Sequence, residues 1–379
     1  MRVLIAPAAF GDRLGAVQVG AAMAEGWAET APGDLVDVVP MSDGGPGFGE
    51  AVLAATGGEV LPCTVRGPTG DPVPAAVVLA SGTAYVAAAE ACGRHLLPPE
   101  RRDPGRTTSY GVGQLIQAAV DAGARRVVVG VGGTATNDAG AGLLAALGGG
   151  PEAGLDRGGL ALSGISAEDV SGLAGLRARL AGVELVLAAA RDLPLLGFHG
   201  TSATYAEAKG ASPDQAQALE SALGHFAHLA ARSLVSARPL AGFGPAAQPG
   251  AGAGGGIGFA LLLLGATYAP GVEVVAQAAG LAERIKRADL GITAEETFDW
   301  QSLTGGVVAG VAAAGLDCGV PVVVVAGQVL VGRRESMTLG LSGAYPVTER
   351  PEDVESALAD PVQALQRRTA RVARTWSRR

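Results

Sequence analysis

Short apolar runs alternate along most of the chain with longer stretches in which apolar residues recur at helical spacing. The runs are rich in β-branched residues and bounded by turns, which is typical of parallel strands buried on both faces. They predict strands at Arg2–Ala6, Val36–Pro40, Arg126–Val131, Glu184–Ala188, Leu290–Thr293 and Pro321–Ala326. The longer stretches predict helices at Ala16–Glu29, Tyr110–Ala122, Ala139–Leu147, Pro213–Ser233, Val272–Arg287 and Pro361–Arg374. This alternation predicts an α/β fold.

One segment departs from that alternation. Residues 59–89 contain short strand patterns separated by turn signals at 67–70 and 81–83, which indicates an antiparallel excursion. The final third then returns to strand and helix units like those of the first sixty residues. We therefore expect a doubly wound, flavodoxin- or Rossmann-like domain made from both chain ends, 1–58 and 284–379. An α/β domain, 59–283, is expected to be inserted into it.

Composition narrows the class of protein. With 379 residues, 48% hydrophobic and 17% charged, the chain can bury a large core. A net charge of -8 argues against nucleic acid or an anionic membrane as partner, since both need a basic face. No apolar run approaches the roughly 20 residues of a membrane span. Three widely spaced cysteines suit a reduced protein. We expect a cytoplasmic protein that acts on a small molecule. The composition is compatible with either a monomer or a homo-oligomer.

The segment from Val129 to Gly142 combines a strand, a turn of glycines and threonines, and a helix. Glycines let the backbone approach a phosphate, threonines add hydroxyl donors, and the first N–H groups of the helix are expected to point unpaired into the turn. We therefore predict a phosphate or nucleotide site. Its candidate residues are Gly132, Gly133, Thr134, Thr136 and Asn137. The alternative interpretation is a tight turn that binds no ligand.

A second glycine tract, 249–258, opens another apolar helix, and two such loops favour a bound phosphate chain. Its candidate phosphate-binding residues are Gly252, Gly254, Gly255 and Gly256. Gly250, Gly252 and Gly255 also match G-x-G-x-x-G, but Gln248-Pro249 stand where a dinucleotide fold needs a strand. The chain has neither a P-loop motif nor the protein-kinase motifs. A phosphotransferase with this sequence would belong to neither class.

Few residues offer the positive charge of a lysine or the ligands of a metal. The only lysines are Lys209 and Lys286. His225 and His228 stand three apart on a predicted helix, which more often means an ordinary helix face than a metal pair. Asp138 could cap the helix that follows it or meet phosphate or Mg²⁺, and the two roles are compatible.

In this order along the chain, these segments resemble the bacterial glycerate kinase family. The resemblance spans nearly the whole length. It is carried by residues 4–7, 40–45, 130–142, 194–197, 209–211 and 249–258, and by Ile292-Thr293 with Glu295, Asp299 and Gln301. The resemblance implies transfer of the ATP γ-phosphate to glycerate with Mg²⁺. It also implies a flavodoxin-like domain from the two chain ends and an inserted α/β domain.

The resemblance also implies roles for retained residues. Asp43, in Asp43-Gly44-Gly45, is expected in the catalytic site rather than only as a helix cap. Glu295 and Asp299 keep the spacing of a metal or ribose site and are expected near the nucleotide, with a plain surface role as the alternative. Lys209 lies in a matching loop and is expected to contact phosphate or substrate rather than solvent.

The sequence departs from the family pattern where chemistry is expected. The family pattern D-S-F-K-G-S is replaced here by Ala8-Ala9-Phe10-Gly11-Asp12-Arg13, which lacks its acid and its lysine. The pattern C-D-V-x-N-P-L is replaced by Ala189-Ala190-Arg191-Asp192-Leu193-Pro194-Leu195, with alanine at the position of the acid. Gly306 stands where the family usually has a lysine. Asp192 could replace the missing acid if the preceding strand continues that far, because side chains on a strand alternate with period two. Its alternative is a solvated residue that caps the loop before Pro194. Arg13 could replace a missing lysine, although a guanidinium is a broad fork rather than a point charge, and its alternative is a solvated arginine on an exposed turn. The competing hypothesis is a catalytically degenerate relative that binds a nucleotide or a small hydroxy acid for regulation or assembly.

Overall fold

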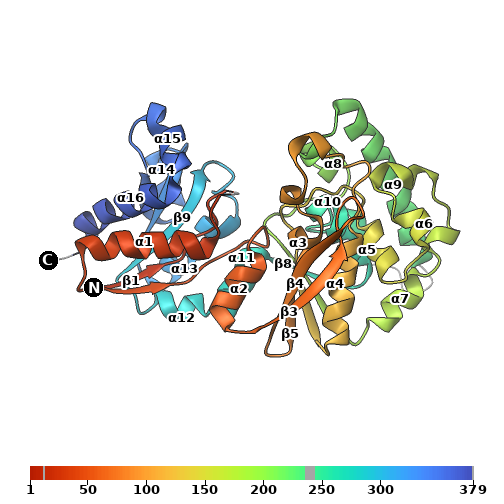
Figure 1. Cartoon of the computed structure of the whole chain (residues 1–379), viewed down its shortest axis with the longest axis horizontal. Coiled ribbons are helices and arrows are strands. Elements are labelled where there is room, and N and C mark those ends of the chain that lie inside the picture. Colours follow the sequence, from red (N-terminus) through yellow and green to blue (C-terminus); the bar gives the residue numbers. More distant parts are fainter. Residues whose placement is uncertain (12, 235–243, 378–379) are drawn as a thin grey trace. The chain divides into compact units, whose positions relative to one another are not determined.

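The structure is a computed structural model that describes residues 1–11, 13–234 and 244–377 (Figure 1). It is an α/β protein with two compact units. The first unit comprises Met1–Asp43, Glu50–Gly57 and Gly271–Arg379, and the second comprises Gly44–Gly49 and Gly58–Pro270. The first unit is thus built from both ends of the chain. Its C-terminal part begins at residue 271, whereas the predicted flavodoxin-like domain resumes at 284.

The first unit is built on a parallel sheet. Its strands are β1 (Arg2–Ile5), β2 (Leu35–Val38), β9 (Leu290–Phe298), β10 (Val322–Val329) and β11 (Leu341–Pro346). They lie in the order β11-β10-β9-β1-β2, and every neighbouring pair is parallel. Counted within this unit the order is 2-1-3-4-5, which is the flavodoxin-like arrangement of a doubly wound fold.

Helices pack on both faces of this sheet because its side chains alternate with period two. Val323 and Val325 of β10 belong to a core shared with α1 (Ala16–Thr30) and α16 (Pro361–Trp376). Val322 points to the other face, against α13 (Gly306–Cys318). The helix comes so close there that a Cβ at Gly315 would lie 2.2 Å from Cγ2 of Val322. The apolar residues of α1, which recur at helical spacing, therefore pack against the sheet, as the sequence pattern predicts.

The remaining helices of this part of the chain are short. They are α2 (Phe48–Thr56), within which the boundary between the units falls, α11 (Gly271–Ala279), α12 (Leu281–Ile285), α14 (Arg333–Thr338), α15 (Val354–Ala359) and the 3₁₀ turn Pro351–Asp353. The single helix predicted at Val272–Arg287 is wrong. Gly280, with φ of 62°, takes the left-handed conformation and separates α11 from α12.

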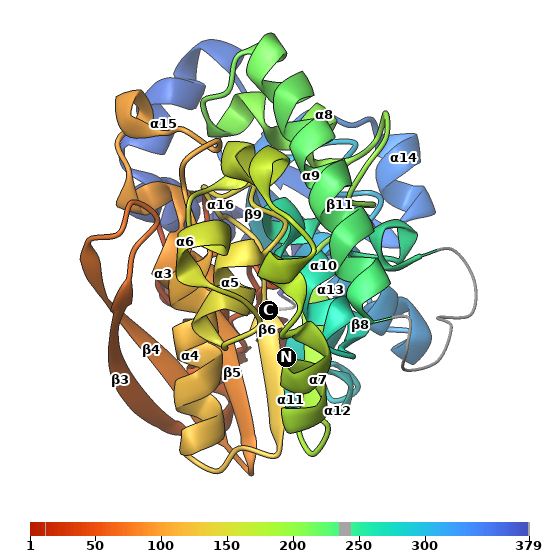
Figure 2. The same ribbon diagram turned by 90° about the vertical axis from the view of Figure 1, so that its right-hand side faces the viewer.

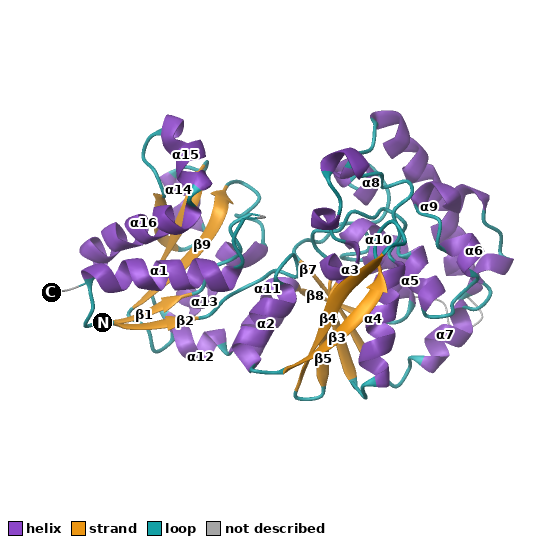
Figure 3. Ribbon diagram, viewed as in Figure 1, coloured by secondary structure: helices purple, strands orange, loops and turns teal. Residues whose placement is uncertain are grey.

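The second unit has a mixed sheet (Figures 2 and 3). Its strands are β3 (Glu59–Arg66), β4 (Pro72–Ala80), β5 (Thr83–Ala87), β6 (Arg126–Gly130), β7 (Glu184–Ala189) and β8 (Thr267–Pro270), in that spatial order. The pairs β3–β4 and β4–β5 are antiparallel, as the excursion at 59–89 predicts, and β5 to β8 are parallel. The pattern of the sequence did not predict β8 or, in the first unit, β11.

The helices of the second unit share one large core with its sheet. The longest is α9 (Pro213–Ser233), which begins after Ser212, whose hydroxyl accepts a hydrogen bond from the Gln215 N–H. The others are α3 (Ala88–Cys92), α4 (Tyr110–Asp121), α5 (Ala141–Ala146), α6 (Glu152–Leu155), α7 (Leu173–Arg179), α8 (Thr201–Tyr205) and α10 (Ala253–Leu263), with 3₁₀ turns at Arg94–Leu96, Pro99–Arg101, Gly159–Gly164, Glu168–Val170, Glu207–Lys209 and Pro245–Ala247. Across the described parts of both units, every helix is too short or too polar to span a bilayer.

Candidate functional site

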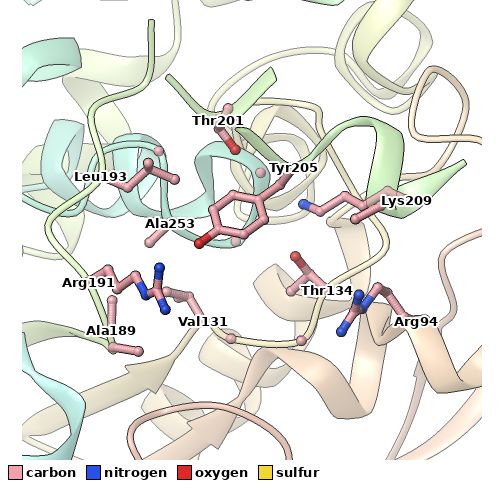
Figure 4. Close-up of a pocket in the computed structure, with 17 residues that line it drawn as sticks. Arg94, Val131, Thr134, Ala189, Arg191, Leu193, Thr201, Tyr205, Lys209 and Ala253 are labelled. Carbon is pink, nitrogen blue, oxygen red and sulfur yellow. The ribbon is translucent and has the colours of Figure 1, made fainter. Parts of the chain in front are cut away.

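The second unit contains a cavity of about 220 Å³ (Figure 4). Five segments line it: the 3₁₀ turn that begins at Arg94, the turn after β6, the end of β7 with the residues that follow it, the short helical segment that runs from Thr201 to Lys209, and the glycine tract at the start of α10. The turns after β6 and β7 meet here because the two strands are parallel neighbours, so their carboxyl ends lie at one edge of the sheet.

The two glycine-rich segments of the sequence come together at this cavity. Ala139 donates its N–H to the Gly255 carbonyl at 2.9 Å, and the Thr136 hydroxyl donates to the Gly254 carbonyl at 3.3 Å. A Cβ on Gly255 would lie 1.8 Å from the Thr136 carbonyl oxygen. Gly254, Gly255 and Gly256 have φ of 65°, 73° and 92°, all left-handed. These glycines are therefore required for contact between the two backbone segments as well as for the shape of the cavity.

The N–H groups at the start of α5, which were expected to point unpaired into the turn, have partners within the protein. The first three helical N–H groups are already bonded within the protein: Ala141 donates to the Asp138 carbonyl at 2.9 Å, Gly142 to Asp138 Oδ2 at 3.3 Å, and Leu143 to the Ser109 hydroxyl at 3.0 Å. An anion would have to displace these bonds.

The Asp138 carboxylate itself is completely buried. Beyond the bond from Gly142, it accepts hydrogen bonds from the Ser109 N–H and hydroxyl, both at 2.8 Å, and from the Gly140 N–H at 3.1 Å. Burial raises its pKa, and these hydrogen bonds pull the pKa back down. Asp138 does not line the cavity. Its geometry fits the helix-capping role better than that of a metal ligand.

Two threonine hydroxyls in the cavity wall have no hydrogen-bond partner within the part of the chain that the structure describes. Thr134 and Thr201 are 3% and 1% exposed, and for neither hydroxyl oxygen do the described residues provide a hydrogen bond. Figure 4 shows both side chains at the edge of the space among the labelled residues. A buried hydroxyl without a hydrogen bond costs about 1–3 kcal/mol. Two such groups facing one cavity indicate a place for polar ligand atoms.

Lys209 carries a buried positive charge into the same cavity. Its side chain is 7% exposed, and Nζ donates a hydrogen bond to the Thr136 carbonyl oxygen at 2.6 Å. The pKa of Lys209 is lowered to about 8, chiefly by burial, with the positive charge of Arg94 acting in the same direction and the negative charges of Cys92 and Asp138 opposing it. An anion bound beside these two like charges would relieve their repulsion and the cost of burying the ammonium group.

Arg191 lines the cavity from another direction, with Tyr205 drawn between it and Lys209 in Figure 4. Among the described residues, the lining includes three cationic side chains, Arg94, Arg191 and Lys209, and no Asp or Glu. Sequence reasoning identified Lys209 but missed Arg94, Thr201 and Tyr205, which belong to no motif singled out there. Arg191 lies in the segment 189–195, but the sequence analysis gave it no role of its own beside the missing acid at Ala190.

The structure separates the candidate residues of the second unit into two groups. Those that line the cavity are Gly132, Gly133, Thr134, Gly252, Gly254, Gly255 and Lys209. Those that do not line it are Thr136, Asn137, Asp138, Asp192 and Gly256. Asn137 is buried behind the turn and donates to the Ser202 hydroxyl at 3.1 Å. Asp192 is exposed and lies past the end of β7 at Ala189, so the strand alternation that would have placed it at the acid position does not reach it.

The first unit brings three of its candidate carboxylates together. The pKa of Glu295 is raised to about 7, chiefly by burial; a hydrogen bond with Ser302 opposes the rise, and the negative charges of Asp299 and Asp43 add to it. Glu295 Oε1 is buried and has no hydrogen-bond partner among the described residues. Asp299 accepts the Gln301 N–H at 2.7 Å. Within the described residues, no three His, Cys, Asp or Glu side chains are placed to hold a metal ion by themselves.

Arg13, also in the first unit, has partners away from these carboxylates. It donates from Nη1 to the Leu358 carbonyl oxygen at 2.5 Å, and its Nε lies 3.7 Å from Glu296 Oε1. Its side chain is 52% exposed. The guanidinium is thus held at the end of α15.

Comparisons with known proteins agree with this architecture. The model of the glycerate kinase family matches residues 3–377. A glycerate kinase of Bacillus subtilis is 36% identical over 98% of this chain and 96% of its own length. A glycerate 2-kinase of Escherichia coli is 38% identical over 86% of this chain and 85% of its own length. An uncharacterized protein of Mycobacterium bovis is 40% identical over 98% and 91%.

A solved structure shows the same fold. The crystal structure assigned to glycerate kinase 2 of Salmonella typhimurium LT2 superposes with a TM-score of 0.78 at 34% identity, and covers 99% of this chain and 98% of that one. The family model and the identities hold over nearly the whole length. This chain therefore belongs to the glycerate kinase family.

Proposed function

We propose that this protein transfers the γ-phosphate of ATP to a hydroxyl group of glycerate or a related small hydroxy acid, giving phosphoglycerate or its counterpart. The observation that carries the proposal is the cavity of the second unit, which is lined by three cationic side chains and by two buried hydroxyls that have no hydrogen-bond partner among residues 1–11, 13–234 and 244–377. Relatives named glycerate kinase support the same reaction class.

The size of the cavity indicates what it holds. Pockets for drug-sized ligands occupy about 300–1,000 Å³, and this cavity has about 220 Å³. It therefore suits a short organic acid, with a phosphoryl group next to it, better than a whole nucleotide. We propose that the hydroxy acid binds in this cavity. Gly132 and Gly133 of the first tract and Gly252, Gly254 and Gly255 of the second form part of its wall.

The lining residues supply positioning and charge rather than a base. Lys209 and Arg94 would neutralise the carboxylate of the acid, and the hydroxyls of Thr134 and Thr201 would donate to its oxygens. The acceptor hydroxyl oxygen attacks the γ-phosphorus, the bond from that phosphorus to the bridging oxygen of ADP breaks, and the hydroxyl proton leaves to water. Catalysis would rest on orientation and charge stabilisation, which dominate phosphoryl transfer.

ATP and Mg²⁺ are the cofactors that this reaction needs, with Mg²⁺ neutralising charge on the phosphates. In such sites Mg²⁺ usually keeps several waters and takes one or two carboxylates plus phosphate oxygens. Glu295 and Asp299 of the first unit offer that donor set, and Glu295 Oε1 has no hydrogen-bond partner in the described part of the chain. We propose that they serve the nucleotide and its metal, with Asp43 beside them. We propose no catalytic role for Arg13 or Asp192, given their placement.

A second candidate function is binding without turnover. The absence of Asp and Glu from the cavity lining favours it, since a positioned base contributes about 10²–10⁴-fold to rate. Such a protein would bind a small acid or a nucleotide for regulation or assembly.

The deciding experiment incubates the purified protein with Mg-ATP and glycerate and measures ADP and phosphoglycerate. We expect product at rates of order 1–100 s⁻¹ and a drop of about tenfold in kcat/KM for Thr201→Val. Thr204→Val, at an exposed position of the same helix, is the matched control. Thermal stabilisation by glycerate or ATP without product would support the binding function instead. No product and no stabilisation would overturn both.

A further inference from the structure

A second cavity lies in the first unit. It has a volume of about 380 Å³ and is lined by the segment after β11, by α15 with the turn before it, and by one face of α16. Among the described residues, its charged lining consists of Arg350, Arg367, Arg371, Glu349 and Asp353. Arg367 and Arg371 stand four apart on α16, so their side chains are neighbours on that helix. Of the described residues in this lining, none is one that we propose for the acid, the nucleotide or Mg²⁺.

A buried guanidinium lies at the wall of this cavity. Arg368 is 6% exposed, and its Nε and Nη2 are buried without a hydrogen-bond partner among the described residues. Its Nη1 lies 3.5 Å from Oε1 of Glu349, which lines the cavity. Burial lowers the pKa of Arg368, the negative charge of Glu349 opposes this, and the positive charge of Arg371 adds to it. Buried charges are normally paired and hydrogen-bonded, so Arg368 is short of negative partners.

Glu349 is a weak partner that a ligand can replace. Its side chain is 72% exposed, and its Oε1 lies 3.5 Å from Nη1 of Arg368 and 3.8 Å from Nη1 of Arg371. An ion pair this long, made by an exposed carboxylate, contributes about 0–1 kcal/mol. An oxyanion in place of that carboxylate would lie between the two guanidinium groups. It would accept from Nη1 of Arg368 and, end-on, reach the Nη2 that has no partner within the described residues.

The charge and size of the site indicate the class of ligand. With the Glu349 carboxylate displaced, three lining arginines and Arg368 behind them face the single carboxylate of Asp353 among the described residues. A phosphate monoester brings about two negative charges and three acceptor oxygens, and arginine forks bind such groups bidentately. A carboxylate brings less charge and fewer oxygens. The volume of about 380 Å³ leaves room for a few carbon atoms beside the phosphate.

We propose that this cavity is a second anion site, which binds the phosphate group of a small phosphate monoester through Arg368 and Arg371, with Arg367 beside them. The site is separate from the cavity of the second unit and does not include Glu295 or Asp299. The inference therefore does not depend on the proposed function. The bound ester would stabilise the folded protein by mass action.

The test measures binding of glycerol phosphate, a phosphate monoester without a carboxylate, by titration calorimetry without nucleotide. It is made with the whole chain and again with Lys209→Met, which weakens anion binding in the other cavity, and the affinity of this site should be the same in both. Arg371→Gln, at a 62% exposed side chain, should weaken binding at least tenfold. Glu349→Gln should strengthen binding about threefold, because it removes the competing carboxylate. Arg374→Gln, at an exposed arginine of the same helix outside the lining, is the matched control and should change nothing.

Three results would overturn the inference. The first is no binding of glycerol phosphate, or equal effects of Arg371→Gln and Arg374→Gln. The second is loss of the glycerol phosphate signal when ATP is added, which would assign the cavity to the nucleotide. The third is inorganic phosphate that binds as tightly as the ester, whereas we expect it to bind several-fold more weakly. Turnover plays no part in these measurements, so absence of ADP formation would reject only the proposed function.

Discussion

Lys209 donates a hydrogen bond from Nζ to the backbone carbonyl of Thr136, 73 residues earlier in the chain, at 2.6 Å. Thr136 in turn donates from its hydroxyl to the Gly254 carbonyl. The lysine is therefore tied to the contact between the two glycine-rich segments while its ammonium group faces the cavity. The position of the Lys209 charge thus depends on the same backbone contact that shapes the cavity wall.

Replacing Lys209 should weaken anion binding strongly with little loss of stability. Lys209→Met removes the ammonium that attracts the carboxylate, but it also removes the cost of burying a charge, so the free energy of unfolding should change by less than about 1 kcal/mol. Glycerate affinity should fall at least tenfold by calorimetry. Lys286→Met, at the other lysine, which is exposed, is the control.

The same lysine makes anion binding depend on pH. Burial lowers its pKa from the ordinary value of 10.5 to about 8, so the charged form that attracts an anion dominates only below pH 8. Glycerate affinity should fall up to about tenfold per pH unit between pH 8 and 10, and Lys209→Arg should remove that fall because a guanidinium keeps its charge. A flat affinity profile for the unaltered protein would show that Lys209 does not meet the anion.

Glu295 should make the protein less stable as pH rises. Burial raises its pKa in the folded state to about 7 from 4.5, so between these values the folded state binds more protons than the unfolded state. Stability from this group is present below pH 4.5 and is lost as pH rises through 7. Urea denaturation should find Glu295→Gln equal to the unaltered protein near pH 4.5 and more stable at pH 8. Asp317→Asn, at an exposed acid, should show no such difference.

Gly255→Ala should destabilise the second unit strongly. Its φ of 73° disfavours any residue with a Cβ, and that Cβ would lie 1.8 Å from the Thr136 carbonyl oxygen. We expect a loss of about 3 kcal/mol or more in chemical denaturation. Gly175→Ala, in the exposed part of α7 with nothing within 4 Å of the new Cβ, should instead stabilise by about 0.5–1 kcal/mol. Similar effects of the two variants would contradict the packing described for the glycine tract.

Asp138→Asn should lower stability whether or not Mg²⁺ is present. The amide replaces a buried carboxylate that accepts hydrogen bonds from Ser109, Gly140 and Gly142, and the loss should be about 2–3 kcal/mol. Asp169→Asn, whose carboxylate accepts similar bonds at an exposed turn, should cost less than 1 kcal/mol. The measurement is thermal unfolding with and without Mg²⁺. A cost that appears only with Mg²⁺ would instead make Asp138 a metal ligand.

The sequence predicted long helices with clear start signals well, and it missed short strands and breaks within helices. The helix at Pro213–Ser233 is confirmed to the residue, because Ser212 and Pro213 are strong start signals. The strand β8 was missed because four residues ending in a proline carry too little pattern to stand out. The break at Gly280 was missed because the apolar spacing continues across it, and a left-handed glycine leaves no periodic signal.

By itself the sequence determined the α/β class, the antiparallel excursion, the assembly of one unit from both chain ends, and the family, because these follow from local periodicity and from motif order along the chain. It also indicated both glycine tracts and Lys209. Only the tertiary structure decided that the N–H groups of α5 are occupied by Asp138 and Ser109, and that Arg94, Arg191 and Thr201 share a cavity with Lys209. The reason is physical: hydrogen bonds and cavity walls join residues far apart in sequence, and no spacing along the chain encodes which of them meet.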